Sequence, residues 1–181
     1  MSGVLRPWLL ELATRGLFEP RWSERIGREW SRNAARIWAV TPEVLDEAWQ
    51  SMQQQFPAAN VVPALGQPQI ELRYSDAKDW HVIQTAWQVK QQHPQASVGV
   101  LTYNVKDFSR SELRALGLDL WDPDRFVCTL WPAHGSCLTE TLSQTIEDLV
   151  EAKRRLPAPV SSFLKRERLF RLNKLMHPPP Q

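Results

Sequence analysis

Apolar residues recur at helical spacing through the first half of the chain. Where they fall three or four positions apart, one face of a helix is buried and the opposite face is solvated. Pro7 favours a first helical turn and Gly16 a left-handed C-terminal cap, while Ser23 and Thr41 are typical N-caps. The pattern predicts four helices, at residues 7–16, 22–38, 41–55 and 76–92.

Two short apolar runs break this spacing and predict strands instead, at residues 96–103 and 118–121. The first is rich in valine and is bounded by Pro94 and Asn104, which suits a buried parallel strand. Between the two runs, residues 109–116 predict a short helix. Helices that alternate with short strands favour a layered α/β domain with right-handed connections.

Proline and aspartate mark the expected loops. Residues 57–75 hold three prolines around one short apolar piece, so we expect a loop with at most one short strand. The sequence Asp122-Pro123-Asp124 is typical of a turn, here leading into residues 125–127.

The character of the chain changes in its last third. Two helices are expected, at residues 139–155 and 161–175, with Pro157 and Pro159 between them and a proline-rich tail behind. We therefore divide the chain into an α/β domain at 1–131 and a C-terminal helical extension at 132–181.

Charge is divided along the same line. Residues 152–181 contain eight Lys or Arg and one Glu, a local net charge of +7, whereas the whole chain has +2. An acidic body with a basic appendage is common in proteins that bind nucleic acid, and it equally describes helices that pack on the body and leave a basic face in solvent. The RNA-binding interpretation assigns contacts to Lys165, Arg166, Arg168 and Arg171.

Composition limits the remaining classes of function. With 43% hydrophobic and 23% charged residues, no long apolar run and no visible signal peptide, the sequence predicts a soluble cytoplasmic protein without a membrane span. Two cysteines and four histidines lack the spacing of a zinc site. Oxygen ligands are the metal chemistry that remains, and no nucleotide-binding glycine loop is present.

Acidic residues border the predicted helix at 76–92 and the strand that follows it. Asp76 and Asp79 lie at the start of the helix, and Asp107 follows the strand. Because loops at the carboxyl edge of an α/β sheet meet there, Asp79 and Asp107 are expected to come together. Converging carboxylates suit Mg²⁺ or Mn²⁺, so metal-assisted phosphodiester hydrolysis becomes a hypothesis.

Each of these acids also has a structural interpretation. Asp76 is a good N-cap, and Asp79 would favour the positive end of the helix dipole. Asp107 suits a turn or the next cap, and Glu29 with Asn33 suits an exposed pair one helical turn apart. The nine tryptophans favour core and interface positions over base stacking.

Three segments together resemble a known family. The runs DAKDWHV at 76–82, LTYNVKDF at 101–108 and DPDRF at 122–126 resemble bacterial PIN-domain proteins of the VapC-like toxin type. The segment 5–24, with Glu29 and Asn33 after it, fits the same group. The resemblance covers about residues 4–130 and implies a three-layer α/β/α fold with a small, mostly parallel sheet.

The resemblance also implies roles for individual residues. Catalytic, metal-binding acids are expected at Glu29, Asp79 and Asp107, with Mg²⁺ or Mn²⁺ as the cofactor. His81 is expected to be a structural hydrogen-bonding residue. Supporting or substrate-positioning roles are expected for Asn33, Thr102 and Asn104, the last of which stands where many relatives have an aspartate.

Two functions follow from the resemblance. The first is a metal-dependent endoribonuclease, the toxin of a toxin–antitoxin pair, with RNA as substrate, an antitoxin protein as partner and homo-oligomers as a further expectation. The second is a truncated or catalytically impaired PIN-like module that binds a protein or RNA without cleavage. Both stay open because the family pattern begins with a buried strand ending in an aspartate, and this sequence has neither before Leu5.

Overall fold

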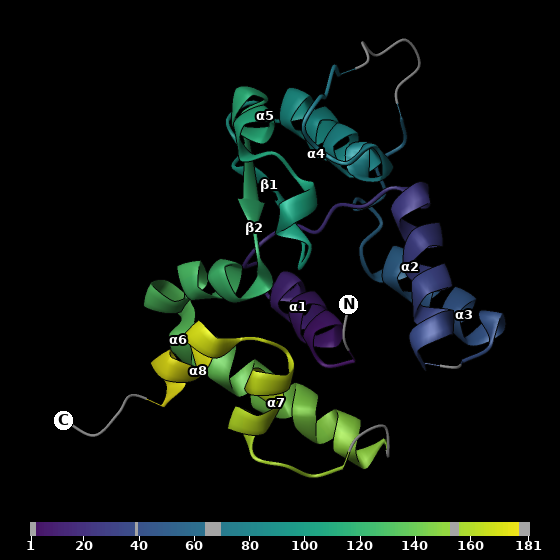
Figure 1. Cartoon of the computed structure of the whole chain (residues 1–181). Coiled ribbons are helices and arrows are strands. Elements are labelled where there is room, and N and C mark those ends of the chain that lie inside the picture. Colours follow the sequence, from purple (N-terminus) through teal and green to yellow (C-terminus); the bar gives the residue numbers. More distant parts are fainter. Residues whose placement is uncertain (1–2, 39, 64–69, 153–155, 178–181) are drawn as a thin grey trace. The chain divides into compact units, whose positions relative to one another are not determined.

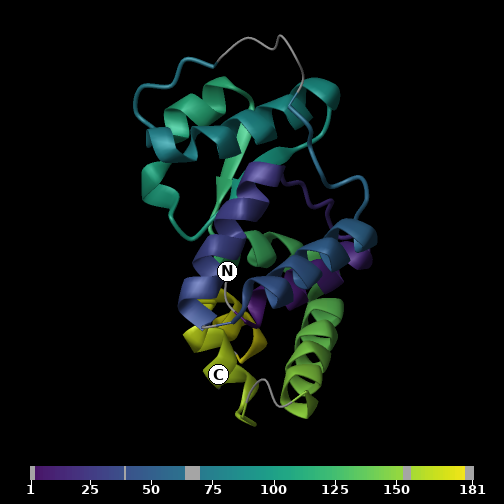
Figure 2. The same ribbon diagram turned by 90° about the vertical axis from the view of Figure 1, so that its right-hand side faces the viewer.

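The computed structural model describes residues 3–38, 40–63, 70–152 and 156–177. Its chain forms two compact units, shown in Figures 1 and 2. Unit 1 contains residues 1–19 and 122–181, and unit 2 contains residues 20–121. These limits differ from the expected boundary at residue 131, which falls within the helical segment Pro123–Glu151. Among the described residues, no helix has the length and apolar character needed to cross a membrane.

Unit 2 contains the sheet and the helices around it. Its helices are α2 (Glu24–Trp38), α3 (Pro42–Gln55), α4 (Trp80–Gln92) and α5 (Arg110–Ala115), with short 3-10 helices η1 (Ala77–Asp79) and η2 (Val105–Asp107). Strands β1 (Val98–Leu101) and β2 (Leu118–Trp121) pair in parallel, from Val98 opposite Leu118 to Leu101 opposite Trp121. The expected α/β class is therefore confirmed at this coarse level, with two parallel strands in the described part of the chain.

The sheet has its own apolar core. Helix α4 packs against β1 and α5 against β2. Ile83 from α4, Val100 from β1 and Leu113 from α5 are all almost fully buried there. Gly117, with φ of +70°, lets the chain turn from α5 straight into β2, which a residue with a side chain would resist.

Helices α2 and α3 pack side by side through aromatic residues (Figure 2). Trp49 of α3 lies 5.6 Å from the ring of Trp22 and 6.2 Å from that of Trp30. Gly27 makes this contact possible, because an added Cβ would lie 2.4 Å from the Trp49 ring. The side of α2 that holds Gly27 is thus fixed against α3, and Ile37 near the end of α2 is 68% exposed.

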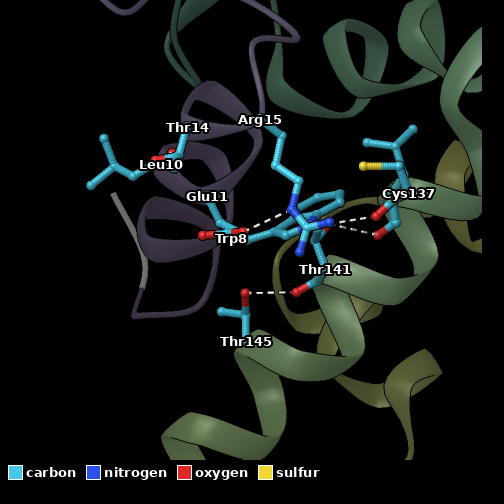
Figure 3. A network of polar contacts seen from close by, with 9 residues as sticks. Trp8, Leu10, Glu11, Thr14, Arg15, Cys137, Thr141 and Thr145 are labelled. Carbon is cyan, nitrogen blue, oxygen red and sulfur yellow. Dashed lines mark hydrogen bonds and ion pairs between the residues drawn. The ribbon is translucent and has the colours of Figure 1, made fainter. Parts of the chain in front are cut away.

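Unit 1 is helical and is built from both ends of its sequence. Helix α1 (Leu5–Thr14) packs against α6 (Pro123–Glu151), and α7 (Val160–Arg166) and α8 (Phe170–Met176) complete the unit. Leu5, Trp8 and Leu12 of α1 are fully buried in the shared core. The indole Nε1 of Trp8 donates to the hydroxyl of Thr141 on α6 at 3.0 Å. Figure 3 shows both residues within the polar network between α1 and α6.

Two expectations for this region are wrong, and a third is confirmed in part. Asp122-Pro123-Asp124 does not form a turn leading into residues 125–127, because Asp122 caps α6 by accepting from the N–H of Arg125 at 2.9 Å. The helix expected at 139–155 is confirmed over residues 139–151, where it forms the second half of α6, which begins at Pro123 and bends at His134. The helix expected at 161–175 is divided into α7 and α8 near Arg168, whose φ is 57°. The expected ends at 153–155 and 178–181 lie outside the described residues.

A buried carboxylate holds α8 to α6. Asp124 accepts hydrogen bonds from the backbone N–H groups of Arg171 at 2.8 Å and Leu172 at 3.0 Å, in the first turn of α8. Leu169, which precedes α8, offers no side-chain cap. Asp124 therefore serves as an N-cap that comes from a distant part of the chain.

We predict that Asp124→Asn destabilises unit 1 by about 1–3 kcal/mol, because an amide nitrogen would replace one acceptor and leave a buried N–H unpaired. Urea denaturation would measure the loss, and hydrogen exchange at Arg171 and Leu172 would locate it. Glu147→Gln removes the same charge from an exposed site on α6 and serves as the control. Equal stability of the two variants would contradict the capping role.

Candidate functional site

Three carboxylates converge in unit 2. Oxygens of Asp76, Asp79 and Asp107 all lie within 4.8 Å of one another. The expected meeting of Asp79 with Asp107 is therefore found, and Asp76 joins them. Such a group can hold a metal ion, because hard divalent cations bind several oxygen ligands at close range.

The backbone of two loops sets this spacing. Asp76 caps η1 by accepting from the N–H of Lys78 at 3.0 Å, as the sequence predicts for an N-cap. Its own N–H donates to the carbonyl oxygen of Asp107 at 2.8 Å. Capping and membership of the acidic group are therefore compatible, since one carboxylate has lone pairs for both.

Glu112 of α5 anchors the loop that leads to Asp76. Its Oε1 accepts from the N–H groups of Arg73 at 2.5 Å and Tyr74 at 2.8 Å. Its Oε2 accepts from the N–H and the hydroxyl of Ser75 at 2.9 and 2.7 Å. Burial raises the pKa of Glu112, but these hydrogen bonds outweigh that effect and the net pKa is lowered.

Ser75 extends the anchor to the second loop. Its hydroxyl oxygen accepts from the N–H of Ser109 at 2.9 Å, two residues after Asp107. The loops that contain Asp76 and Asp107 are thus tied together by a backbone hydrogen bond and through Ser75, and Glu112 holds the second of these two ties.

Glu29 lies beside this group on α2. Its Oε2 is 3.1 Å from Nε2 of His81, and its Oε1 is 3.5 Å from Nε of Arg25. Nδ1 of His81 lies 2.8 Å from the carbonyl oxygen of Lys78, so Nδ1 must be the donor and Nε2 faces the glutamate. His81 is almost fully buried, which agrees with the structural hydrogen-bonding role expected for it.

The pKa of Asp79 is shifted by burial and by the neighbouring charges. Burial, followed by the charges of Asp107 and Asp76, raises its pKa, the charge of His81 opposes the rise, and Glu29 adds a smaller raising effect. The carboxylates are therefore held at mutual electrostatic cost in the absence of a cation. A bound divalent cation would attract all three carboxylates and offset their mutual repulsion, so this set of oxygen donors fits a metal ion.

The expected supporting residues are brought together in part. The side-chain amide of Asn104 donates to Asp107, and Thr102 Oγ1 accepts from the N–H of Asn104 at 3.0 Å. Asn33 is exposed on α2 and makes no hydrogen bond to the acidic side chains within the described part of the chain.

The basic residues assigned to RNA lie in unit 1. Lys165, Arg166 and Arg168 are exposed, and the guanidinium of Arg166 lies 5.6 Å from the ring of Phe163. Arg171 is 3.5 Å from Asp122 and 3.8 Å from Asp124, so its charge is partly neutralised within the unit.

No family model, no curated protein and no solved structure matches this chain.

One residue of the site was not expected from the sequence. Glu112 has no predicted role, whereas Asp76 is among the acids expected at the start of the helix, with an N-cap as its structural interpretation. A signal for Glu112 does exist, since Ser109-x-x-Glu112 has the form of a capping box. Ser109 does cap α5, but the carboxylate of Glu112 turns to the 73–75 loop instead of back to Ser109.

We predict that Glu112→Gln loosens the acidic group without unfolding the sheet. Hydrogen exchange at Arg73, Tyr74 and Ser75 should accelerate about tenfold or more, because hydrogen bonds to a charged acceptor are each worth about 1.5–3 kcal/mol. Glu47→Gln, an exposed acid on α3, is the control of equal charge. Unchanged exchange in the Glu112 variant would show that the loop is held by other contacts.

We also predict that Asp79→Asn stabilises the metal-free protein. Because the folded pKa of Asp79 is raised, its contribution to stability is present at low pH and is lost as pH rises through the folded pKa. Thermal unfolding in EDTA at neutral pH should show a higher midpoint for the variant, whereas added Mn²⁺ should stabilise only the wild type. Asp46→Asn on α3 is the control, and a lower midpoint for Asp79→Asn in EDTA would contradict the assignment.

Proposed function

We propose that this protein is a metal-dependent endoribonuclease of the PIN type, acting as the toxin of a toxin–antitoxin pair. The observation behind the proposal is the group of three carboxylates within 4.8 Å, positioned by Glu112 and flanked by Glu29. The sequence resemblance supplies the type of reaction and the expectation of a neutralising protein partner.

Asp76, Asp79 and Asp107 would hold Mg²⁺ or Mn²⁺. The bound cation would lower the pKa of a coordinated water and offset charge on a phosphate. Oxygen donors favour these two hard cations, and Asp76 has an oxygen engaged with Lys78 that limits how far its carboxylate turns.

The other residues hold the acids in place or move protons near them. Asn104 donates to Asp107 and so keeps that carboxylate oriented. Glu29 contacts His81 and Arg25 and lies outside the group of three aspartates. Its carboxylate is suited to accept a proton from the attacking water. The exposed basic side chains of Lys165, Arg166 and Arg168 supply a surface for RNA phosphates.

The proposal predicts cleavage of mixed cellular RNA by the full chain in Mn²⁺ or Mg²⁺, with no cleavage in EDTA. Asp107→Asn should lower the rate by about a hundredfold or more, since even a residue that supports a metal ligand is worth about 10- to 100-fold. Product analysis on denaturing gels would measure it, with Asp46→Asn as the matched control. If the chain binds RNA but cleaves it in neither Mn²⁺ nor Mg²⁺, the second candidate is favoured, a PIN-like module that binds but does not cut.

A further inference from the structure

Helix α2 presents a stripe of arginines. Arg25, Arg28, Arg32 and Arg36 are all exposed and follow one another at intervals of three, four and four residues. At 1.5 Å per residue the stripe extends about 16 Å along the helix. The buried side of α2 at Gly27 and Ala34 faces the other way, so the arginines are held outward by the packing of α2 on α3.

The stripe has few partners in the protein. Arg25 pairs with Glu29, while the side chains of Arg28, Arg32 and Arg36 make no hydrogen bond or ion pair with another residue in the described ranges. Like charges one turn apart on a helix are mildly destabilising. The concentration of three such cations in a row therefore favours an anion from outside the chain.

The stripe lies beside the acidic group. With about 100° of rotation per residue, Arg25, Arg32 and Arg36 fall within about 60° of Glu29 around the axis of α2. Glu29 in turn contacts His81, two residues after Asp79. A chain of phosphates along the stripe would therefore pass close to the carboxylates.

Exposed aromatic residues border the same carboxylates. Tyr74 is 71% exposed, and Trp80 and Tyr103 are each 38% exposed. Tyr74 lies two residues before Asp76, the indole of Trp80 donates to the carbonyl of Ser75 at 2.9 Å, and Tyr103 precedes Asn104. The guanidinium of Arg73 lies 5.6 Å from the centre of the Tyr74 ring, a cation that can also meet a phosphate. Exposed aromatic rings of this kind suit unpaired nucleotide bases, which stack on them.

We propose that the α2 stripe binds the phosphates of a single-stranded nucleic acid while Tyr74, Trp80 and Tyr103 stack its bases. The identification of this strand as the RNA substrate rests on the proposed function, but the surface itself does not. Arginine binds phosphate through two parallel hydrogen bonds, and the exposed aromatic rings offer stacking surfaces to bases, so the two features together match the two parts of a nucleotide.

The test is binding of a fluorescently labelled, unpaired RNA to the full chain in EDTA. Arg32→Gln with Arg36→Gln should weaken binding on the order of tenfold or more at about 0.1 M salt and reduce the slope of log K against log salt by about 1.4, or 0.7 per lost contact. Arg110→Gln with Arg114→Gln is the matched control, with the same spacing on α5 and the same charge change. Circular dichroism would verify that both double variants fold.

Two further arms identify the ligand class. Tyr74→Ala and Tyr103→Ala should each weaken binding about fivefold or more and leave the salt slope unchanged, because stacking releases no counterions. Single-stranded DNA of the same sequence should bind with the same dependence on α2, since it shares the phosphates and base faces. Displacement by polyglutamate together with indifference to both tyrosines would overturn the proposal in favour of an acidic protein.

The outcome for α2 is separable from that for the catalytic proposal. Equal RNA affinity and salt slope in the α2 variant and the wild type would falsify the stripe, as would an equal loss in the α5 control. Binding that depends on α2 but leads to no cleavage in any metal would leave the stripe standing and remove the endoribonuclease.

Discussion

The carboxylate of Glu112 is the contact on which the acidic group depends. It receives four hydrogen bonds from residues 73–75, and through Ser75 it also governs the loop after Asp107. Like charges gathered as closely as Asp76, Asp79 and Asp107 would separate if their loops were free. The carboxylate of Glu112, on helix α5, thus offsets the repulsion among the three aspartates by holding their loops in place.

Local signals predicted the elements whose ends are set locally. Helix α3 begins at Pro42 after Thr41 and ends at Gln55 as expected, and β2 occupies the expected residues. The prediction of a turn at Asp122 was wrong because Asp-Pro is both a turn signal and a helix start, and neighbouring residues alone do not decide between the two. The break at Arg168 has no glycine to mark it, and burial of Leu169 and Leu172 together with the distant cap from Asp124 sets it.

The same distinction applies to the candidate site. Asp79 and Asp107 were predicted to meet because loops at one edge of a parallel sheet converge, and that rule needs only the order of elements. Asp76 and Glu112 could not be placed in this way, since their roles depend on how the 73–75 loop folds back on α5. The arginines of α2 show a regular spacing in the sequence, yet which side of the helix faces solvent is decided by the contact of Gly27 with Trp49.

Unit 1 joins two stretches of chain that are separated by the whole of unit 2. The bond between Trp8 and Thr141 spans 133 positions, whereas unit 2 is continuous in sequence. Closing so long an interval costs only slightly more entropy than closing a shorter one, because the cost grows with the logarithm of length. The consequence is a delay during synthesis, because the apolar side of α1 emerges long before the α6 residues that bury it. Exposed apolar surface of that kind is what chaperones bind.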